Sequence, residues 1–261
     1  MKISMYDFER FIYKDGDGAQ AEKMWDDKSA GFYERTEKIQ KKFANEFVFK
    51  LIKERRILNT DSEVLDIGCG TGRHLLEFSK YTQHLTGIDI SSKMLSYAKE
   101  KLAHIPQARL VHGSWLKTFT REKEFDFVFA CMTPAISSAE HLKRMSMISK
   151  KCMLERFVYQ KDDIQEEIEQ LIGRKLFNLP HNDKDYVYGA WNILWHSDYL
   201  PQVFFDTREN TETHTVEDYT CGIKCTDEEK AAIVNLVAAK AVNGAVTATE
   251  RVIKAVVLWE T

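Results

Sequence analysis

The segment VLDIGCGTGRH, residues 64–74, is the most informative part of this sequence. A short apolar strand runs into Gly68, Gly70 and Gly72, and a helical pattern follows. Glycine tolerates positive φ and lets a ligand approach the backbone. Loops at the carboxyl ends of parallel strands are where α/β sheets bind ligands. We therefore expect this loop to bind a nucleotide-like ligand.

An acidic residue at the end of the next strand makes the pattern more specific. Asp89 follows Gly68 by 89 − 68 = 21 residues, where a carboxylate can accept hydrogen bonds from both hydroxyls of a ribose. A dinucleotide fingerprint needs a further glycine where this chain has Arg73, which argues against a nicotinamide coenzyme. Asp66, two residues before the first glycine, fits the ammonium of an amino acid better than a pyrophosphate.

The residues around the loop alternate between strand and helix patterns. This order is typical of a doubly wound, mostly parallel α/β sheet with right-handed crossovers. We expect the last strand inside the sheet, because an unpaired apolar edge favours aggregation. Seven strands are predicted, at residues 63–68, 84–89, 108–112, 125–132, 152–158, 203–206 and 251–259.

Two regions lie outside this alternation. Apolar residues four apart predict one amphipathic helix over residues 31–56, so residues 1–56 are expected to form an N-terminal helical cap on a domain of residues 57–261. Residues 174–200 are rich in Asn, Asp, Tyr and Trp without a clear period, and we interpret them as a lid-like insertion after the fifth strand, with a short helix at 189–196. Thr226 and Glu229 form a capping box that opens a later helix.

Composition limits the class of protein. The 261 residues carry 37 Lys and Arg against 40 Asp and Glu, a formal charge of −3, so nucleic-acid binding is disfavoured. No apolar run reaches the roughly 18 residues that span a bilayer, and no secretory signal is evident, so we expect a cytoplasmic protein without membrane association. Five scattered cysteines suit reduced thiols. We expect no metal site. The eight histidines do not have the spacing of metal-binding motifs, and the Cys221/Cys225 pair has no second Cys or His pair nearby.

The runs DIGCGTG (66–72), GIDIS (87–91) and FDFVFA (125–130) resemble the class I S-adenosylmethionine-dependent methyltransferases, of the small-molecule type. The segment MWDDKSAGFYE (24–34) is also similar to the part of such enzymes that precedes the Rossmann-like core and closes over the cofactor. The resemblance covers most of residues 24–160 and implies that fold and S-adenosyl-L-methionine as cofactor. It does not explain residues 174–245.

The resemblance implies a role for each matching position. Asp66, Gly68, Cys69, Gly70, Thr71 and Gly72 would hold the methionine part of the cofactor, with Asp89 on the ribose and Ile90 and Met94 against the adenine. Ser114 stands where many members have an acid for the adenine amino group, and Trp115 would cover the ring. Cys131, Met132 and Thr133 follow the strand where the family places the methyl donor beside its acceptor, with Cys131 counted among the cofactor contacts.

The acceptor is the least defined part of this hypothesis. The chain lacks the Asn/Asp-Pro-Pro-Tyr/Phe motif of amide- and base-modifying relatives, so we expect a small-molecule acceptor, contacted by Tyr33, Thr133 and Trp195, with His196 as the candidate base. The basic residues Lys41, Lys42, Arg55 and Arg56 keep open an RNA or protein methyltransferase. A non-catalytic S-adenosylmethionine-binding module is the remaining alternative. The sequence does not determine the oligomeric state.

Overall fold

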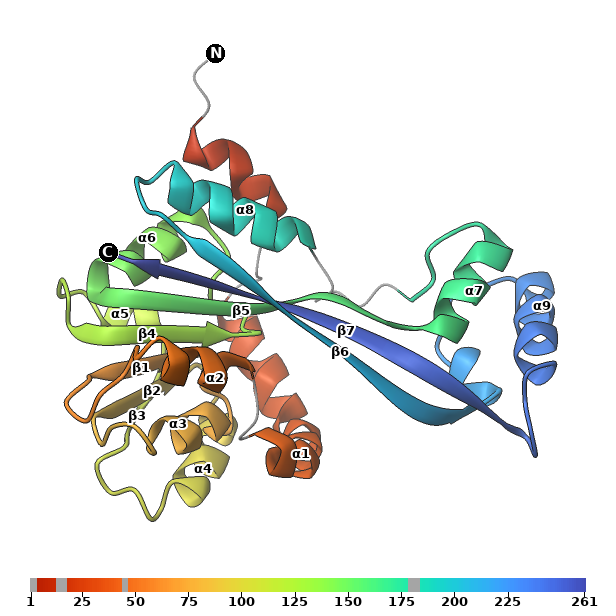
Figure 1. Ribbon diagram of the computed structural model, residues 1–261. Coiled ribbons are helices and arrows are strands. Elements are labelled where there is room, and N and C mark those ends of the chain that lie inside the picture. The colour runs from red at the N-terminus through yellow and green to blue at the C-terminus, as the bar shows by residue number, and fades with distance from the viewer. Residues whose placement is uncertain (1–3, 13–17, 44–46, 178–183) are drawn as a thin grey trace. The chain divides into compact units, whose positions relative to one another are not determined.

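A computed structural model describes residues 4–12, 18–43, 47–177 and 184–261. Strands and helices alternate from β1 to α7, residues 64–172, as the sequence predicts (Figure 1). The elements are η1 (Met5–Phe11), α1 (Gly18–Phe43), α2 (Phe47–Glu54), β1 (Val64–Ile67), α3 (Arg73–Phe78), β2 (Leu85–Asp89), α4 (Ser92–Lys101), β3 (Arg109–His112), α5 (Trp115–Thr118), β4 (Phe125–Cys131), α6 (Ala139–Ile148), β5 (Ser149–Asp162), α7 (Asp163–Ile172), α8 (Lys184–Trp195), β6 (Gln202–Thr215), η2 (Glu217–Tyr219), α9 (Asp227–Ala238) and β7 (Ala245–Glu260).

The strands form one seven-stranded sheet in the order β3-β2-β1-β4-β5-β7-β6. Strands β1 to β5 pair in parallel, with β2 and β4 on either side of β1. This arrangement confirms the predicted α/β, mostly parallel sheet, and β7 lies inside it as expected. The strand order reverses between β1 and β4, and doubly wound sheets bind their ligands outside the carboxyl ends of the strands at such a point.

Both faces of the sheet are covered by helices, which is why its central strands are almost continuously apolar. Residues of α2, α3 and α4 form one buried core with Phe127 and Phe129 of β4. On the opposite face, the Trp259 indole donates to Ser146 Oγ of α6 at 2.9 Å, and the Cys152 thiol to the Met145 carbonyl at 3.4 Å.

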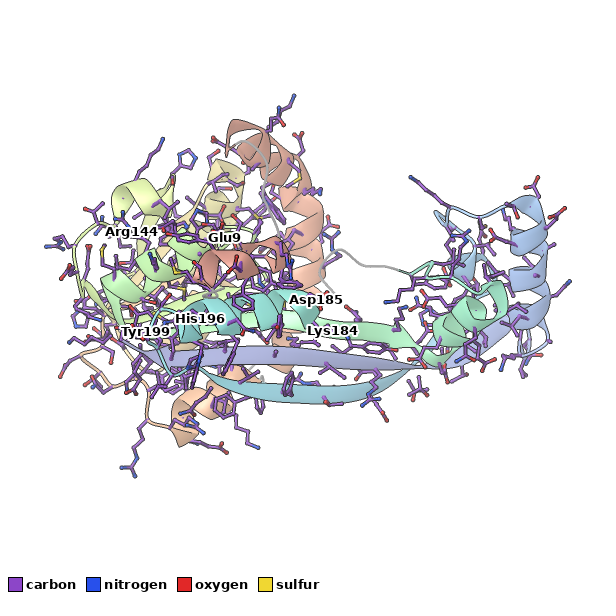
Figure 2. All side chains as sticks on the ribbon, turned by 90° about the horizontal axis from the view of Figure 1, so that it is seen from above. Glu9, Arg144, Lys184, Asp185, His196 and Tyr199 are labelled. Atoms are coloured by element: carbon purple, nitrogen blue, oxygen red, sulfur yellow. The ribbon has the colours of Figure 1, made fainter. Side chains whose placement is uncertain are left out.

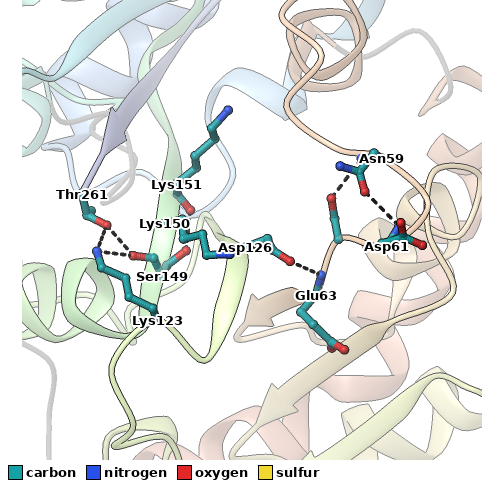
Figure 3. Close-up of polar contacts among 10 residues, drawn as sticks. Asn59, Asp61, Glu63, Lys123, Asp126, Ser149, Lys150, Lys151 and Thr261 are labelled. Carbon is teal, nitrogen blue, oxygen red and sulfur yellow. Dashed lines mark hydrogen bonds and ion pairs between the residues drawn. The ribbon is translucent and has the colours of Figure 1, made fainter.

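Polar contacts hold the amino ends of β1, β4 and β5 together (Figure 3). The Asp126 carboxylate accepts from the Glu63 amide at 2.9 Å and from Lys150 Nζ at 2.7 Å. Partial burial opposes ionisation of this group, but these hydrogen bonds hold the pKa of Asp126 below its usual value. Nearby, Lys123 Nζ donates to the Ser149 carbonyl at 2.9 Å. This edge lies at the opposite end of the strands from the glycine loop.

Several predicted bounds were wrong. The structure has two helices, α1 and α2, in place of one over residues 31–56, and α1 begins earlier, at Gly18. The apolar stripe that predicts one helix includes Ile39 and Phe43, whose side chains the structure does not describe. The helix expected at 189–196 begins at Lys184, although residues 178–183 lie outside the description.

Strands β5, β6 and β7 are longer than predicted, at 14, 14 and 16 residues. Their extensions carry many exposed or half-buried polar residues, which apolar runs do not reveal. The predicted capping box opens α9 as expected: the Glu229 amide donates to Thr226 Oγ1 at 3.2 Å, and the Glu229 carboxylate accepts from the Thr226 amide at 2.9 Å.

The chain divides into two compact units. The first comprises residues 1–155, 185–204 and 256–261, and the second comprises residues 156–184 and 205–255. The second has its own core, formed mainly by α7, α9 and the start of β7 (Ile164, Ile168, Tyr219, Ile233, Val237, Val246 and Ala248). The expected division into a cap, a core domain and an insertion at 174–200 stays a prediction. In the described part of the chain, no helix has both the length and the apolar composition to cross a membrane.

Candidate functional site

The glycine loop between β1 and α3 has left-handed backbone at each of its three glycines. The φ angles are 68° at Gly68, 53° at Gly70 and 74° at Gly72. Gly68 also lies against the loop that follows β4, since a Cβ atom placed on it would stand 2.2 Å from Thr133 Oγ1. Residues 65 positions apart are thus brought together at the strand-order reversal, and only glycine fits there without displacing Thr133.

Asp89 ties the glycine loop to the end of β2. Its Oδ2 accepts from the Gly70 amide and its Oδ1 from the Ser91 amide, each at 2.8 Å. Burial raises the pKa of Asp89 in spite of these donors. A carboxylate has about four lone-pair sites, so Asp89 keeps acceptor capacity for a ligand hydroxyl.

Asp66 is the more unusual carboxylate of the site. It is 1% exposed, and its Oδ2 has no hydrogen-bond partner among the described residues; the Nδ1 of His74 lies 4.0 Å away. Burial raises the pKa of Asp66 well above its usual value. The hydroxyl of Thr71, also 1% exposed, has no partner among the described residues either. Buried polar atoms in this state are costly unless something completes their hydrogen bonds.

Helix α1 contacts the loops at the carboxyl ends of β1 and β2. Asp26 Oδ1 accepts from Ser91 Oγ at 2.5 Å and from the Lys93 amide at 3.2 Å, and the bond from Ser91 lowers the pKa of Asp26. A Cβ atom on Gly70 would lie 3.8 Å from the ring of Phe32. We did not predict Asp26 as a site residue, although it belongs to the MWDDKSAGFYE segment.

The same helix reaches the end of β3. His112 Nε2 lies 3.1 Å from Glu22 Oε1 and 2.9 Å from the carbonyl oxygen of Ile90. His112 was not predicted either, because no spacing pattern links it to Glu22 or Ile90. Met94 is buried in the first turn of α4, where its amide donates to the Ser91 hydroxyl at 3.1 Å.

The loop after β4 is fixed from three sides. Gly68 packs on Thr133, which is itself 7% exposed. The Trp115 indole donates to the Ala135 carbonyl at 3.1 Å, and the Tyr186 hydroxyl of α8 donates to the Ile136 carbonyl at 2.5 Å. The loop that contains Thr133 therefore accepts hydrogen bonds from Trp115 and Tyr186, and the expected roles of Trp115 at the adenine and of Thr133 at the acceptor stay predictions.

Three more of the predicted cofactor contacts make other interactions within the protein. The Cys69 side chain packs toward β2, since a Cβ atom on Gly87 would stand 2.9 Å from its sulfur. The Cys131 thiol donates to Glu155 Oε2 at 3.0 Å. Ser114 is exposed at the start of α5, where its carbonyl accepts from the Thr118 hydroxyl at 2.9 Å.

The remaining predicted residues lie in aromatic contacts. Tyr33 stacks on Tyr97 of α4, with ring centroids 4.3 Å apart. Trp195 is 49% exposed and stacks on Trp191.

His196 is exposed at the end of α8, where Figure 2 labels it, and stacks on Phe8 of η1 at 5.3 Å. In the described part of the chain, none of its contacts joins it to the glycine loop. The roles of Tyr33, Trp195 and His196 stay predictions.

Comparison with known proteins finds a family model that matches part of the chain. Residues 64–151, which contain the glycine loop, Asp89 and the loop after β4, match the family model of the methyltransferase domain. The demethylmenaquinone methyltransferase of Staphylococcus aureus is 39% identical over 70 residues, 26% of this chain. This chain spans only 29% of the length of that relative.

Solved structures with a similar course of the chain have low sequence identity. A methyltransferase-like protein from Bacillus halodurans is 15% identical, with a TM-score of 0.49 over 80% of this chain and 97% of its own. A structure described as a SAM-dependent methyltransferase from Aquifex aeolicus is 17% identical, with a TM-score of 0.48 over 72% of this chain and 91% of its own. Residues 64–151 thus match a methyltransferase domain, in agreement with the family expected from the sequence, and the sheet order agrees with the expected fold.

Proposed function

We propose that this chain transfers a methyl group from S-adenosyl-L-methionine to a small-molecule acceptor by direct displacement. The observation that carries the proposal is the pair of buried acids around the glycine loop. Asp66 Oδ2 lacks a hydrogen-bond donor among the described residues, and Asp89 bridges the ends of β1 and β2.

The described residues fit this cofactor. An ammonium group next to Asp66 would supply the missing donor and offset its buried charge, and the Thr71 hydroxyl could also pair with an amino-acid moiety. Ribose hydroxyls would use the remaining acceptor sites of Asp89. We assign Ile90 and Met94 to the adenine; the Met94 amide donates to the Ser91 hydroxyl, and the Ser91 amide donates to Asp89.

The bound cofactor supplies an electrophilic methyl group on a sulfonium. The chain therefore needs mainly to align the acceptor at about 3 to 3.5 Å and to exclude water, and a dedicated base is optional. Thr133, packed on Gly68, is the residue that we assign to the junction of cofactor and acceptor. His196 remains the candidate base for acceptors that must lose a proton.

Several features support a small acceptor. Two large aromatic side chains, Trp115 and Tyr186 of α8, donate hydrogen bonds to backbone carbonyls just after Thr133. The name of the Staphylococcus relative gives a quinone-type acceptor as the first class to test. We further propose that residues 1–56 cap the cofactor, which the contacts of Asp26 and Phe32 support, and that the protein is cytoplasmic, in keeping with its five free cysteines.

The test measures release of S-adenosylhomocysteine by the purified chain. Separate reactions contain thiols, amines, phenols, carboxylates or reduced naphthoquinones, and parallel reactions contain RNA or a protein pool. Turnover with a small-molecule class, lost in Asp66→Asn, is the expected result. Turnover only with RNA or protein would show that the acceptor is a macromolecule and not a small molecule. Cofactor binding without turnover in any reaction would indicate a non-catalytic binding module.

A further inference from the structure

A second chemical cluster lies next to the glycine loop, on the face of the sheet that α3 covers. One ligand atom each of His74, Cys131 and Glu155 lies within 4.8 Å of the other two. His74 comes from α3, Cys131 from the end of β4 and Glu155 from the facing position of β5. We propose that these three side chains form a binding site for one Zn²⁺ ion. This proposal does not depend on the methyl donor.

The donor set has the chemistry of a zinc site. Thiolate, imidazole and carboxylate are the three side-chain groups that Zn²⁺ takes in proteins, whereas magnesium and calcium prefer oxygen ligands alone. Bond lengths of about 2.0 to 2.3 Å place the ligand atoms of a tetrahedral site roughly 3.3 to 3.6 Å apart. The Cys131 sulfur and Glu155 Oε2 are already 3.0 Å apart, so rotation of the His74 ring and small side-chain shifts would close the site.

Burial adds an electrostatic argument. Glu155 is 1% exposed and His74 is 4% exposed, while Cys131 is half-buried. Zinc binding would convert the Cys131 thiol to a thiolate and release its proton to solvent. The two positive charges of the ion would then balance one thiolate and one carboxylate in a place where lone charges are costly.

The Asp66 carboxylate lies beside the cluster, next to the His74 ring. Its Oδ2 is buried without a partner among the described residues and lies 4.0 Å from the His74 ring. Metal-binding imidazoles are commonly oriented by a nearby carboxylate. The sequence could not reveal this cluster, since its members are 131 − 74 = 57 and 155 − 131 = 24 residues apart. In this proposal the Cys131 side chain contacts the metal in place of the predicted contact with the cofactor.

The main experiment titrates the chelator-treated full chain with Zn²⁺ against a chromophoric chelator, under reducing conditions. The wild type should bind about one equivalent, and Cys131→Ser should bind at least about tenfold more weakly. The matched control is the double variant Cys221→Ser/Cys225→Ser, which removes two thiols outside the cluster and should bind as the wild type does. Wild-type affinity in Cys131→Ser, or loss of binding in the control, would overturn the proposal.

A second measurement does not depend on variants that fold poorly. Co²⁺ added to the wild type should produce a thiolate-to-metal charge-transfer absorption, and this band should persist in the Cys221→Ser/Cys225→Ser control. Glu155→Gln should weaken Zn²⁺ binding, with circular dichroism confirming its fold. Absence of the charge-transfer band from the wild type would reject coordination by Cys131.

Discussion

Substitution of Gly68 by alanine tests how the site is built. Gly68 has a φ of 68°, and a Cβ atom there would lie 2.2 Å from Thr133 Oγ1 and 2.8 Å from Thr133 Cβ. Left-handed backbone costs a non-glycine residue roughly 1–2 kcal/mol. Overpacking of a tight contact costs about 1–3 kcal/mol more. We therefore expect Gly68→Ala to lower the free energy of unfolding by about 2–5 kcal/mol.

Gly70→Ala is the matched control, because Gly70 has a φ of 53° but a Cβ atom there would lie 3.8 Å from its nearest neighbour, Phe32. This variant carries the backbone strain alone. The loss of glycine flexibility in the unfolded chain affects both variants equally, so their difference isolates the clash with Thr133, at about 1–3 kcal/mol.

Urea denaturation followed by circular dichroism measures these free energies. The same substitution made in a Thr133→Gly background should cost only the strain, because both clashing atoms are then absent. A coupling of about 1–3 kcal/mol in this double-mutant cycle is expected. If Gly68→Ala costs no more than Gly70→Ala, or costs the same with and without Thr133, the loops after β1 and β4 are not packed as described.

Three further predictions concern acidic residues. Burial raises the folded-state pKa of Asp66, so its contribution to stability is complete below the unfolded pKa and is lost as pH rises through the folded pKa. At neutral pH, Asp66→Asn should therefore unfold at a higher urea concentration than the wild type while binding S-adenosylhomocysteine more weakly. Equal urea midpoints for the two proteins would contradict this prediction. Asp89→Ala should reduce cofactor affinity by about 1–3 kcal/mol in calorimetry, and unchanged affinity would remove Asp89 from the site. Hydrogen bonds from Lys150 and Glu63 lower the pKa of Asp126, so its contribution is present above the unfolded pKa and is lost as pH falls through the folded pKa. Because Lys150 and Asp126 are partly exposed, this contribution to stability is about 1 kcal/mol or less. The wild type should therefore be more stable than Asp126→Asn at neutral pH but not in thermal unfolding at acid pH. A stability difference that persists at acid pH would refute the lowered pKa of Asp126.

Local patterns account for the parts of the fold and site that were predicted. The glycines, Asp66 and Asp89 lie within 24 residues and their spacing follows from a strand, a turn and a helix. The buried run of β4 and the capping box of α9 are equally local signals. These features need no knowledge of distant residues.

Contacts between distant segments account for what was missed. Asp26 reaches Ser91 across 65 residues, and Cys131 reaches Glu155 through strand pairing. Nothing in the spacing of these residues reveals such contacts. The polar extension of β6 illustrates a second reason: exposed strand residues lack the apolar pattern that marks a strand in sequence.

Calorimetric titration of the purified chain with S-adenosylhomocysteine measures cofactor binding at the glycine loop. The two acids around the glycine loop predict binding at a single site, weakened in Asp66→Asn, and no measurable heat with a nicotinamide coenzyme. A clear isotherm with the nicotinamide coenzyme, together with none for S-adenosylhomocysteine, would contradict the account.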